Sequence, residues 1–220
     1  MFAFCQAYDI IFCMKSLVIL AGGKSSRMGQ DKVLLQYDGE TFIERVFFNA
    51  LECFQRVIIS TDSEEHADMI RSLPLFKDRK PEIVTDRYRA VGPMGGIRSV
   101  FESTDVQRFS IISVDVPFAD MKTLAAIYDR CTLKAAYFKM GDGRVEPLIA
   151  AYDRSGYEDI RKSLNAGLFK MRQVIPREDT VIVTDDEIRR ECPELSAVDF
   201  EMAFRNFNTP EEFASIMKQG

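Results

Sequence analysis

The segment from Leu20 to Leu35 limits what this chain can fold into more than any other stretch. It reads LAGGKSSRMGQDKVLL: a short β-branched run ends in a glycine pair, a polar stretch with three cations follows, and an apolar segment then resumes. Glycine allows positive φ and a close approach of the backbone, so several N–H groups can point at phosphate oxygens. The pattern predicts a loop for a nucleotide phosphate at the end of a strand, with Gly22 and Gly23 in its backbone.

The cations of this segment favour a triphosphate ligand. Lys24, Arg27 and Lys32 would place positive charge where the phosphates lie. The spacing matches neither the Walker loop nor the G-x-G-x-x-G fingerprint, so a dinucleotide dehydrogenase is disfavoured. The alternative is a glycine-rich turn with solvated cations. It is less favoured because such charges repel one another unless an anion gathers them.

Composition narrows the setting. A chain of 220 residues fits one α/β domain with a full core, and a net charge of -5 disfavours nucleic acid as a partner. The five cysteines form no C-x-x-C pair, which predicts a reduced, cytoplasmic protein without structural zinc. The one histidine, His66, lies in a polar helical stretch and is expected to be a surface residue, which nearly excludes metal chemistry based on imidazole.

The first fourteen residues are interpreted as an N-terminal extension. Residues 1–13 are apolar, but they lack a basic flank and are too short to span a bilayer, so neither a signal peptide nor a membrane anchor is expected. Because Met14 stands directly before the first clear strand, we expect translation to begin there. The alternative is an added edge strand or a segment that faces a partner.

Beyond residue 15, strand-like and helix-like segments alternate without a long linker, which is typical of a mostly parallel sheet covered by helices on both faces. We expect strands at 16–20, 57–60, 83–85, 109–114 and 181–184, and two more within 134–152 joined by a turn at Gly141–Gly143. Helices are expected from the capping box Thr41–Glu44, over 64–73, 97–102, 121–131, 157–165 and 168–174, and from Thr209 onward. Residues 15–220 then form a single domain, with a nucleotide half of about 15–118 and an acceptor half of about 119–220.

Polar residues follow the predicted parallel strands where each strand ends. Gly22, Ser60, Asp86 and Asp115 occupy these positions. Ligands of open α/β sheets bind beyond the carboxyl ends of the strands, so these residues should converge on one crevice. Asp115 follows an apolar strand and offers the hard oxygen ligands that Mg²⁺ prefers. The alternative role for Asp115, capping the next helix, suits Asp120 better.

A second glycine cluster, Gly92-Pro-Met-Gly-Gly96, stands between the third strand and its helix. Glycine density at a helix entrance indicates backbone amides that face a ligand, and both Gly92 and Gly96 are candidates for this role. Asp86, just upstream, could accept hydrogen bonds from a base edge or a sugar. A purely structural turn is the alternative, but it is less plausible beside the first loop.

At these residues the chain resembles the molybdenum cofactor guanylyltransferases, within the wider group of nucleotidyltransferases. The resemblance runs from Ser16 to the C-terminal helix. It rests on LAGGKSSRMGQDK, on Asp86 with GPMGG, on DVPF, on RVEPL followed by AAY, and on NFNTPEE from Asn206. The first motif identifies the wider group, and the last, with the EPL segment, points to the molybdenum branch or its cytidylyl counterpart.

The resemblance implies a Rossmann-like, three-layer nucleotidyltransferase fold. It places nucleotide contacts at Leu20, Ala21, Gly22, Lys32, Ser60, Asp86 and Asp115, with Asp115 also the Mg²⁺ ligand. The family commonly has asparagine at the position of Ser60, which makes that assignment the weakest. It commonly has alanine at the position of Gly95, a departure expected to be harmless.

The reaction implied is attack of the terminal phosphate of molybdenum-molybdopterin on the α-phosphorus of GTP, which gives molybdopterin guanine dinucleotide and pyrophosphate. Mg²⁺ would neutralise phosphate charge, and Arg27 with Lys32 would stabilise the leaving pyrophosphate. Arg27 is inferred from charge and position alone. Asn206 and Asn208 are candidates for binding the acceptor, although turn and cap roles before the last helix fit them equally well. Transient contact with other proteins of molybdenum cofactor synthesis is also implied.

Two other functions stay open at this stage. One is a sister transferase that uses CTP with molybdopterin, or another acceptor such as a cobinamide phosphate or a sugar phosphate. The other is a non-catalytic domain that senses nucleotides. The joint presence of Lys32, Asp86 and Asp115 argues against a sensor, since a sensor could lose the metal ligand.

Overall fold

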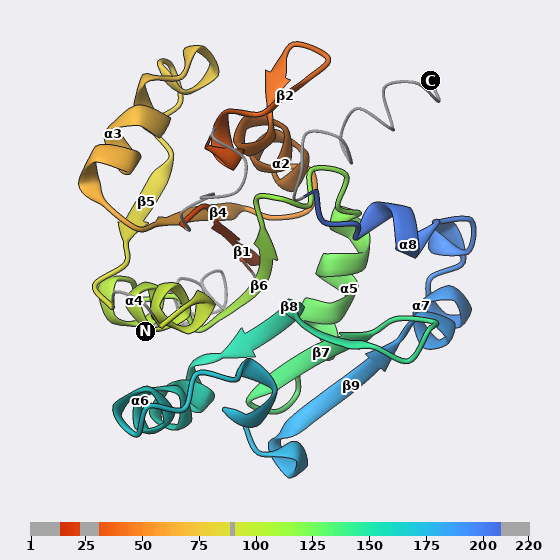
Figure 1. Ribbon diagram of the computed structural model, residues 1–220. Helices are drawn as coiled ribbons and strands as arrows, with labels where there is room; N and C mark the ends of the chain where they lie inside the picture. Colours follow the sequence, from red (N-terminus) through yellow and green to blue (C-terminus); the bar gives the residue numbers. More distant parts are fainter. Residues whose placement is uncertain (1–13, 23–30, 89–90, 208–220) are drawn as a thin grey trace, which may run out of the picture.

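The computed structural model describes residues 14–22, 31–88 and 91–207, and its centre is a seven-stranded sheet with the order β5-β4-β1-β6-β8-β7-β9 (Figure 1). The strands are β1 (Ser16–Leu20), β4 (Arg56–Thr61), β5 (Glu82–Thr85), β6 (Arg108–Ser113), β7 (Ala135–Lys139), β8 (Val145–Asp153) and β9 (Thr180–Thr184). A small hairpin of β2 (Gln36–Tyr37) and β3 (Glu40–Thr41) stands apart from the sheet.

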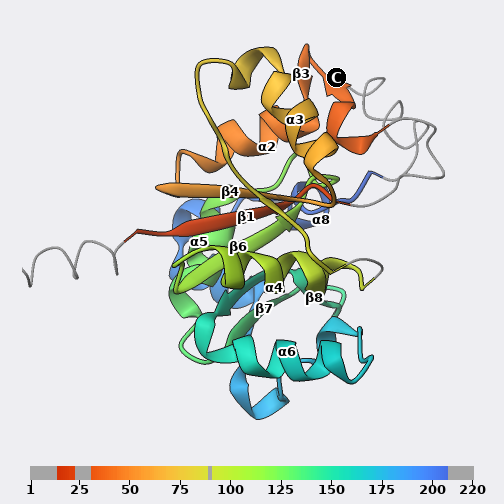
Figure 2. The ribbon, with the colours of Figure 1, turned by 90° about the vertical axis from the view of Figure 1, so that its left-hand side faces the viewer.

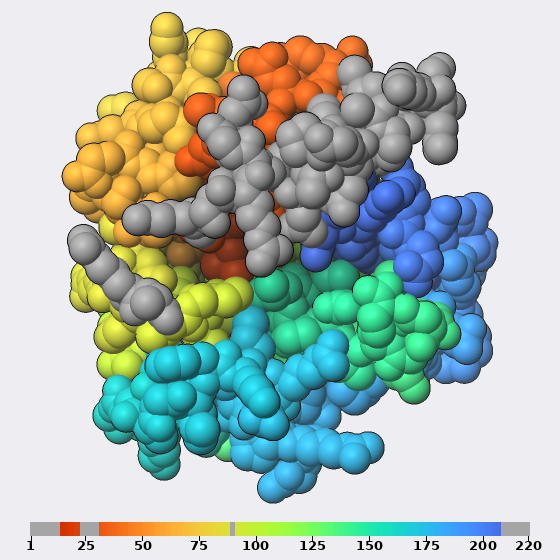
Figure 3. All heavy atoms as spheres, in the orientation of Figure 1, coloured from red at the N-terminus to blue at the C-terminus, as the bar shows by residue number. Residues whose placement is uncertain are grey.

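The sheet is mostly parallel, as predicted, and one strand reverses it. β5, β4, β1 and β6 are parallel neighbours, whereas β8 pairs antiparallel with both β6 and β7. The turn between β7 and β8 contains Gly143 at φ +88°, and it reaches the segment 199–207, which lies beside it on one face of the molecule (Figure 3). The sheet thus runs without a break from the parallel strands β5, β4, β1 and β6 to β8, β7 and β9, which come later in the chain.

Helices cover both faces of the sheet (Figures 1 and 2). They are α2 (Phe42–Ala50), α3 (Glu64–Ser72), α4 (Pro93–Ser103), α5 (Met121–Arg130), α6 (Tyr157–Asn165), α7 (Asp185–Glu191) and α8 (Phe200–Ala203). One apolar cluster joins the sheet to α2, α3, α5, α7 and α8, and a second joins it to α4 and α6. The three-layer class predicted from the sequence is confirmed.

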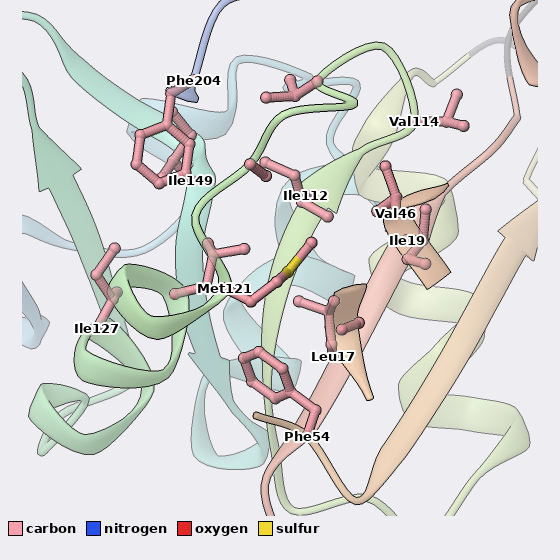
Figure 4. Packing of buried hydrophobic residues seen from close by; sticks show 14 of the residues in the cluster. Leu17, Ile19, Val46, Phe54, Ile112, Val114, Met121, Ile127, Ile149 and Phe204 are labelled. Atoms are coloured by element: carbon pink, nitrogen blue, oxygen red, sulfur yellow. The ribbon is translucent and has the colours of Figure 1, made fainter. Parts of the chain in front are cut away.

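The central strands read as continuous apolar runs because both of their faces are buried. In β1, Leu17 and Ile19 point into the first cluster, while Val18 and Leu20 point into the second. Figure 4 shows Leu17 and Ile19 among side chains from β6 and the neighbouring helices. Burying one such side chain contributes roughly 1.5–3 kcal/mol to the free energy of unfolding. The strand ends are therefore anchored to a rigid support.

Several predicted elements were displaced or absent. The expected helix over 168–174 was wrong: the chain forms only a short 3-10 turn at Met171–Gln173, because Leu168 and Phe169 stay exposed and supply no buried face. α4 begins at Pro93, not Ile97, since proline suits the first turn of a helix. The hairpin of β2 and β3 and the helices α7 and α8 were missed. The expected extension over 1–13 and the helix from Thr209 lie outside the described residues.

Among residues 14–22, 31–88 and 91–207, no helix combines the length and the apolar character needed to cross a bilayer.

Candidate active site

Sheet register places the predicted polar residues along one edge. Leu20 pairs with Ser60 on one side and with Ser113 on the other. The backbone continues these ladders one step further, since Ala21 N donates to Ser60 O at 2.7 Å and Val114 N donates to Leu20 O at 3.0 Å. The residues that follow the parallel strands therefore lie side by side at the carboxyl edge.

Lys32 and Asp115, which are 83 residues apart in the chain, meet at this edge. The Nζ of Lys32 donates to Oδ2 of Asp115 at 2.8 Å, and the two side chains are 22% and 14% exposed. Lys32 opens a 3-10 turn, η1 (Lys32–Leu34), whose N-cap is Asp31. The other oxygen of Asp115, Oδ1, is buried and has no hydrogen-bond partner among the described residues. The site thus contains the charged pair of Lys32 and Asp115, and Oδ1 of Asp115 has no hydrogen-bond partner among the described residues.

A cleft of about 630 Å³ opens next to this pair. Asp115 lines it together with Asn206, and Phe207 N donates to Asp115 O at 2.8 Å, which holds the segment after α8 against the strand end. The cleft is also lined by polar side chains that the sequence analysis did not single out as site residues: Arg144, Glu146, Asp199, Glu201 and Arg205. Arg144 comes from the turn before β8, Glu146 from the start of β8, and the other three from around α8, far away in the sequence. The Gly-Asp-Gly turn and the RVEPL motif were the signals for the first two.

Arg144 stands at the mouth of this cleft among carboxylates. Its guanidinium contacts Asp142, lies 3.6 Å from Glu146 and 3.4 Å from Glu201, and so bridges the β7–β8 turn to α8. The side chain is 54% exposed, so these ion pairs are solvated and exchange readily. An anionic ligand could replace them at small cost.

Asp86 is held in a fixed orientation after β5. Its Oδ1 accepts from Tyr88 N at 2.7 Å and from Ser99 Oγ at 3.0 Å, and its own N donates to Thr61 O. Burial raises the pKa of Asp86, the charge of Asp62 adds to this, and the two hydrogen bonds oppose it. The carboxylate is therefore desolvated and oriented, as expected of a group that recognises a ligand.

Gly95 makes room for Asp86. A Cβ at this position would lie 2.4 Å from Oδ2 of Asp86 and 2.8 Å from Tyr88 O. In this chain a methyl group at position 95 would displace the carboxylate or the backbone beside it, so the glycine is matched to the position of Asp86. The expectation that Gly95 is a harmless departure from alanine stays a prediction. The glycines of this cluster serve packing in the first turn of α4, while Gly92 has φ +66° just before it.

Ser60 reaches the edge, but its side chain is only 2% exposed. It lies beneath Gly96, where a Cβ would come within 2.7 Å of Ser60 Oγ and 3.0 Å of Leu20. Gly96 thus allows α4 to approach the ends of β1 and β4. Leu20 and Ala21 are buried at the same edge, and Gly22 is exposed.

Three of the predicted site residues, Gly23, Arg27 and Asn208, lie outside the described residues. The placement of His66 differs from its prediction as a surface residue. Its side chain is 9% exposed and lies between the carboxylates of Asp31 and Asp62. The sequence pattern misled because Asp31, which is distant in the sequence, lies against the polar helix face that carries His66.

The fold and the site define an α/β protein whose polar residues gather at the carboxyl edge of a parallel sheet, beside a cleft, which is where such folds bind their ligands. A family model described as "MobA-like NTP transferase domain" matches residues 17–186. The chain belongs to this family of nucleotidyltransferases, and it is an enzyme of that class.

Relatives and solved structures agree with this assignment. The chain is 30% identical over 209 residues to a protein of Methanosarcina acetivorans named probable molybdenum cofactor guanylyltransferase, covering 92% of this chain and 90% of the relative. The crystal structure of molybdopterin-guanine dinucleotide biosynthesis protein A from Archaeoglobus fulgidus superposes with a TM-score of 0.73 at 22% identity, over 93% and 100% of the two chains. Rv0371c of Mycobacterium tuberculosis, solved with manganese, superposes with a TM-score of 0.55 at 16% identity, over 84% and 100%.

Proposed function

We propose that this enzyme transfers GMP from GTP to molybdenum-molybdopterin and releases pyrophosphate. The observation that carries the proposal is the Lys32–Asp115 pair, which lies at the edge of the parallel strands and beside the cleft that contains Asn206. Such a pair suits a triphosphate and its cation on one side and an acceptor on the other. The names of the curated relatives support the guanylyl group and the molybdenum acceptor.

The residues present fit a magnesium ion. Asp115 offers a buried oxygen without a partner among the described residues. No group of three or more His, Cys, Asp or Glu side chains that could hold a metal occurs among residues 14–22, 31–88 and 91–207, so these residues would supply few ligands. Mg²⁺ commonly binds through one or two carboxylates and completes its shell with water and substrate phosphates. When bound, it would neutralise charge on the phosphates of the nucleotide.

The chemistry asks mainly for alignment. An oxygen of the acceptor phosphate forms a bond to the α-phosphorus of GTP while the bond from that phosphorus to the oxygen bridging to the β-phosphate breaks, and pyrophosphate leaves with the electron pair. An ionised phosphate needs no general base. Lys32, with Arg27 as inferred from sequence, stabilises the charge on the leaving group. Asp86 accepts hydrogen bonds from the base or the ribose.

The cleft beside Asp115 is the site we assign to the acceptor. Asn206 offers an uncharged donor and acceptor there, and Arg144 offers a cation whose present carboxylate partners are solvated. An acceptor phosphate that displaced Glu201 from Arg144 would lie on the same side of the site as Asp115.

Cys53, Cys131 and Cys192 are free thiols, which supports a reducing compartment such as the cytoplasm.

The decisive experiment measures pyrophosphate release by the purified protein with Mg²⁺, molybdenum-loaded molybdopterin and either GTP or CTP. We expect release with GTP, at least about tenfold faster than with CTP, since selecting one base needs only about 1.4 kcal/mol of differential binding. Faster release with CTP would assign the cytidylyl reaction. Release that requires a different phosphate acceptor would overturn the molybdopterin assignment, and no release with any acceptor would overturn the enzymatic proposal.

A further inference from the structure

His66 lies at the centre of a bridge between two segments of the nucleotide-binding edge. Its Nδ1 is 3.1 Å from Oδ1 of Asp62, which directly follows β4, and its Nε2 is 3.1 Å from Oδ2 of Asp31. The ring is carried by the first turn of α3, where its backbone N donates to the N-cap Ser63 at 3.1 Å. The start of the helix therefore sets the backbone position of His66.

The two carboxylates favour a charged ring. A carboxylate can only accept hydrogen bonds, while a neutral imidazole has one donor and one acceptor nitrogen. Nδ1 is hydrogen-bonded to Asp62, and Nε2 lies at ion-pair distance from Asp31 without the angle of a hydrogen bond, so a ring with a proton on each nitrogen suits both carboxylates. Consistently, pairing with Asp31 raises the pKa of His66, burial opposes this, and Asp62 adds to the increase.

Asp31 uses both of its oxygens. Oδ1 accepts from Val33 N at 3.1 Å and so caps the turn η1, while Oδ2 faces His66. Burial alone would raise the pKa of Asp31, but the bonds from His66 and Val33 together lower it. Asp31 caps η1, and η1 begins with Lys32. The orientation of Asp31 therefore fixes the position of the Lys32 backbone.

The other end of the bridge lies against the start of the phosphate segment. A Cβ on Gly22 would be 3.1 Å from Asp62 N and 3.3 Å from Asp62 Cβ. Asp62 therefore packs on Gly22, the residue that leaves β1, while Asp31 precedes Lys32. His66 ties the residue beside Gly22 to the residue beside Lys32.

We infer that His66 is a positioning residue for Lys32, which fixes Asp31 and η1 so that the Lys32 ammonium is held at Asp115. It touches no substrate in this role and acts only through the lysine. The kinetic part of the inference rests on the proposed function, while the structural part can be tested without it.

A double-mutant cycle gives the kinetic test. H66A should lower kcat/KM for the nucleotide about tenfold in the wild-type background and less than about twofold in a K32A background. The second loss is smaller because His66 acts through Lys32, and K32A has already removed that side chain. D68A is the matched control, since it breaks an exposed pair with Arg71 on the same helix and should change neither background. Equal losses from H66A in both backgrounds would overturn the inference and leave His66 a merely structural residue.

The pH profile adds a readout that a packing defect would not move. As the pH rises through the raised pKa of His66, the ring loses the proton that one of its carboxylates needs. In the wild type, kcat/KM for the nucleotide should therefore fall over this range. H66Q cannot titrate and should lack this alkaline step. The charged groups of the described residues that act on the ring are Asp31 and Asp62. A step that persists in H66Q would contradict the inference.

Nuclear magnetic resonance tests the bridge itself. His66 is the only histidine of the chain, so its ring gives one signal in tag-free protein. We expect it to titrate above 6.5 and to titrate lower in D31N and D62N. The Lys32 side-chain ¹³Cε signal, identified by its loss in K32A, should shift in H66A and stay unchanged in D68A. An unchanged Lys32 signal in H66A would contradict the inference whether or not the protein releases pyrophosphate. Failure of the inference about His66 can therefore be told apart from failure of the proposed function.

Discussion

The proposed nucleotide-binding edge, formed by the ends of β5, β4, β1 and β6, and the proposed acceptor cleft meet at Asp115, but they are built in different ways. The edge consists of the ends of four parallel strands in register, closed by backbone hydrogen bonds such as Asp86 N to Thr61 O at 2.7 Å. The cleft lies between an antiparallel pair with a register shift after Tyr137 and the four-residue helix α8. A rigid edge suits a triphosphate common to many transferases, and a looser wall suits a particular acceptor. Changes at the edge should therefore cost more than changes in the cleft.

The largest effect is expected where the two regions meet. D115N keeps the size of the side chain but removes the charge that pairs with Lys32 and the ionised oxygen that suits a cation. Removing one such electrostatic contribution typically lowers turnover about 10²–10³-fold, and we expect a loss of this size in pyrophosphate release. The unfolding temperature should stay near that of the wild type.

A matched control separates charge at the site from charge in general. D129N removes a carboxylate that is 54% exposed and pairs with Lys15, and it should leave turnover unchanged. Near-normal turnover in D115N would break the comparison, because the metal and the triphosphate would then have to lie elsewhere.

The second prediction probes how tightly the edge is packed. G95A places a methyl group within 2.4 Å of Oδ2 of Asp86, and this overpacking should cost about 1–3 kcal/mol. We expect the KM for the nucleotide to rise about tenfold, which corresponds to about 1.4 kcal/mol, while the KM for the acceptor stays the same. Calorimetric binding of the nucleotide checks this directly. An alanine tolerated without loss of affinity would show that Asp86 moves freely and that the edge is less rigid than argued.

Sequence reasoning worked best where one local rule dominates. The apolar run Ser16–Leu20 matched β1 at both ends, and the capping box at Thr41 and Glu44 begins α2 as expected. The rule that parallel strands end at one edge accounts for the positions of Gly22, Ser60, Asp86 and Asp115, whereas Lys32 was assigned from the phosphate segment and the family resemblance. These features depend on residues close in sequence or on the topology of the whole class.

Prediction from the sequence worked poorly where segments far apart in the chain decide the burial or the position of a residue. The burial of His66 depends on Asp31, 35 residues away, which no helical period can reveal. The lining of the acceptor cleft combines Arg144 with Glu201, which are 57 residues apart, and α8 is too short to leave a periodic pattern. The lack of room for a Cβ at position 95 beside Asp86 is a matter of tenths of an ångström, which only coordinates show.

A smaller effect is expected in the cleft. N206A removes one neutral hydrogen-bonding group, a change of about 1 kcal/mol, so the KM for the acceptor should rise about fivefold with little change in the KM for the nucleotide. N165A, at the end of α6 and outside the lining of the cleft, serves as the control. A rise in the nucleotide KM alone would place Asn206 with the edge and would move the boundary between the two regions.

The smallest effect on activity is expected where α4 joins the strand-end edge to α6, away from the cleft. Glu102 accepts from Arg98 and Tyr157 on one oxygen and from Tyr88 on the other, each at 2.7–2.8 Å. Burial alone would raise the pKa of Glu102, but these three partners together lower it. A lowered pKa means that the stabilisation is present above the ordinary value near 4.3 and is lost as the pH falls through the lowered value.

E102Q should therefore reduce the free energy of unfolding by about 1–3 kcal/mol at pH 7, and the difference from the wild type should shrink as the pH falls toward 3. Denaturant titrations across this range measure it, and E158Q, which alters an exposed pair with Arg161, is the control. Turnover at pH 7 should hardly change, because Glu102 joins α4 to Tyr88 and to α6, and neither Glu102 nor these partners line the cleft. A gap in stability that stayed constant down to pH 3 would mean that packing, not the charge of Glu102, joins the rigid edge to α6.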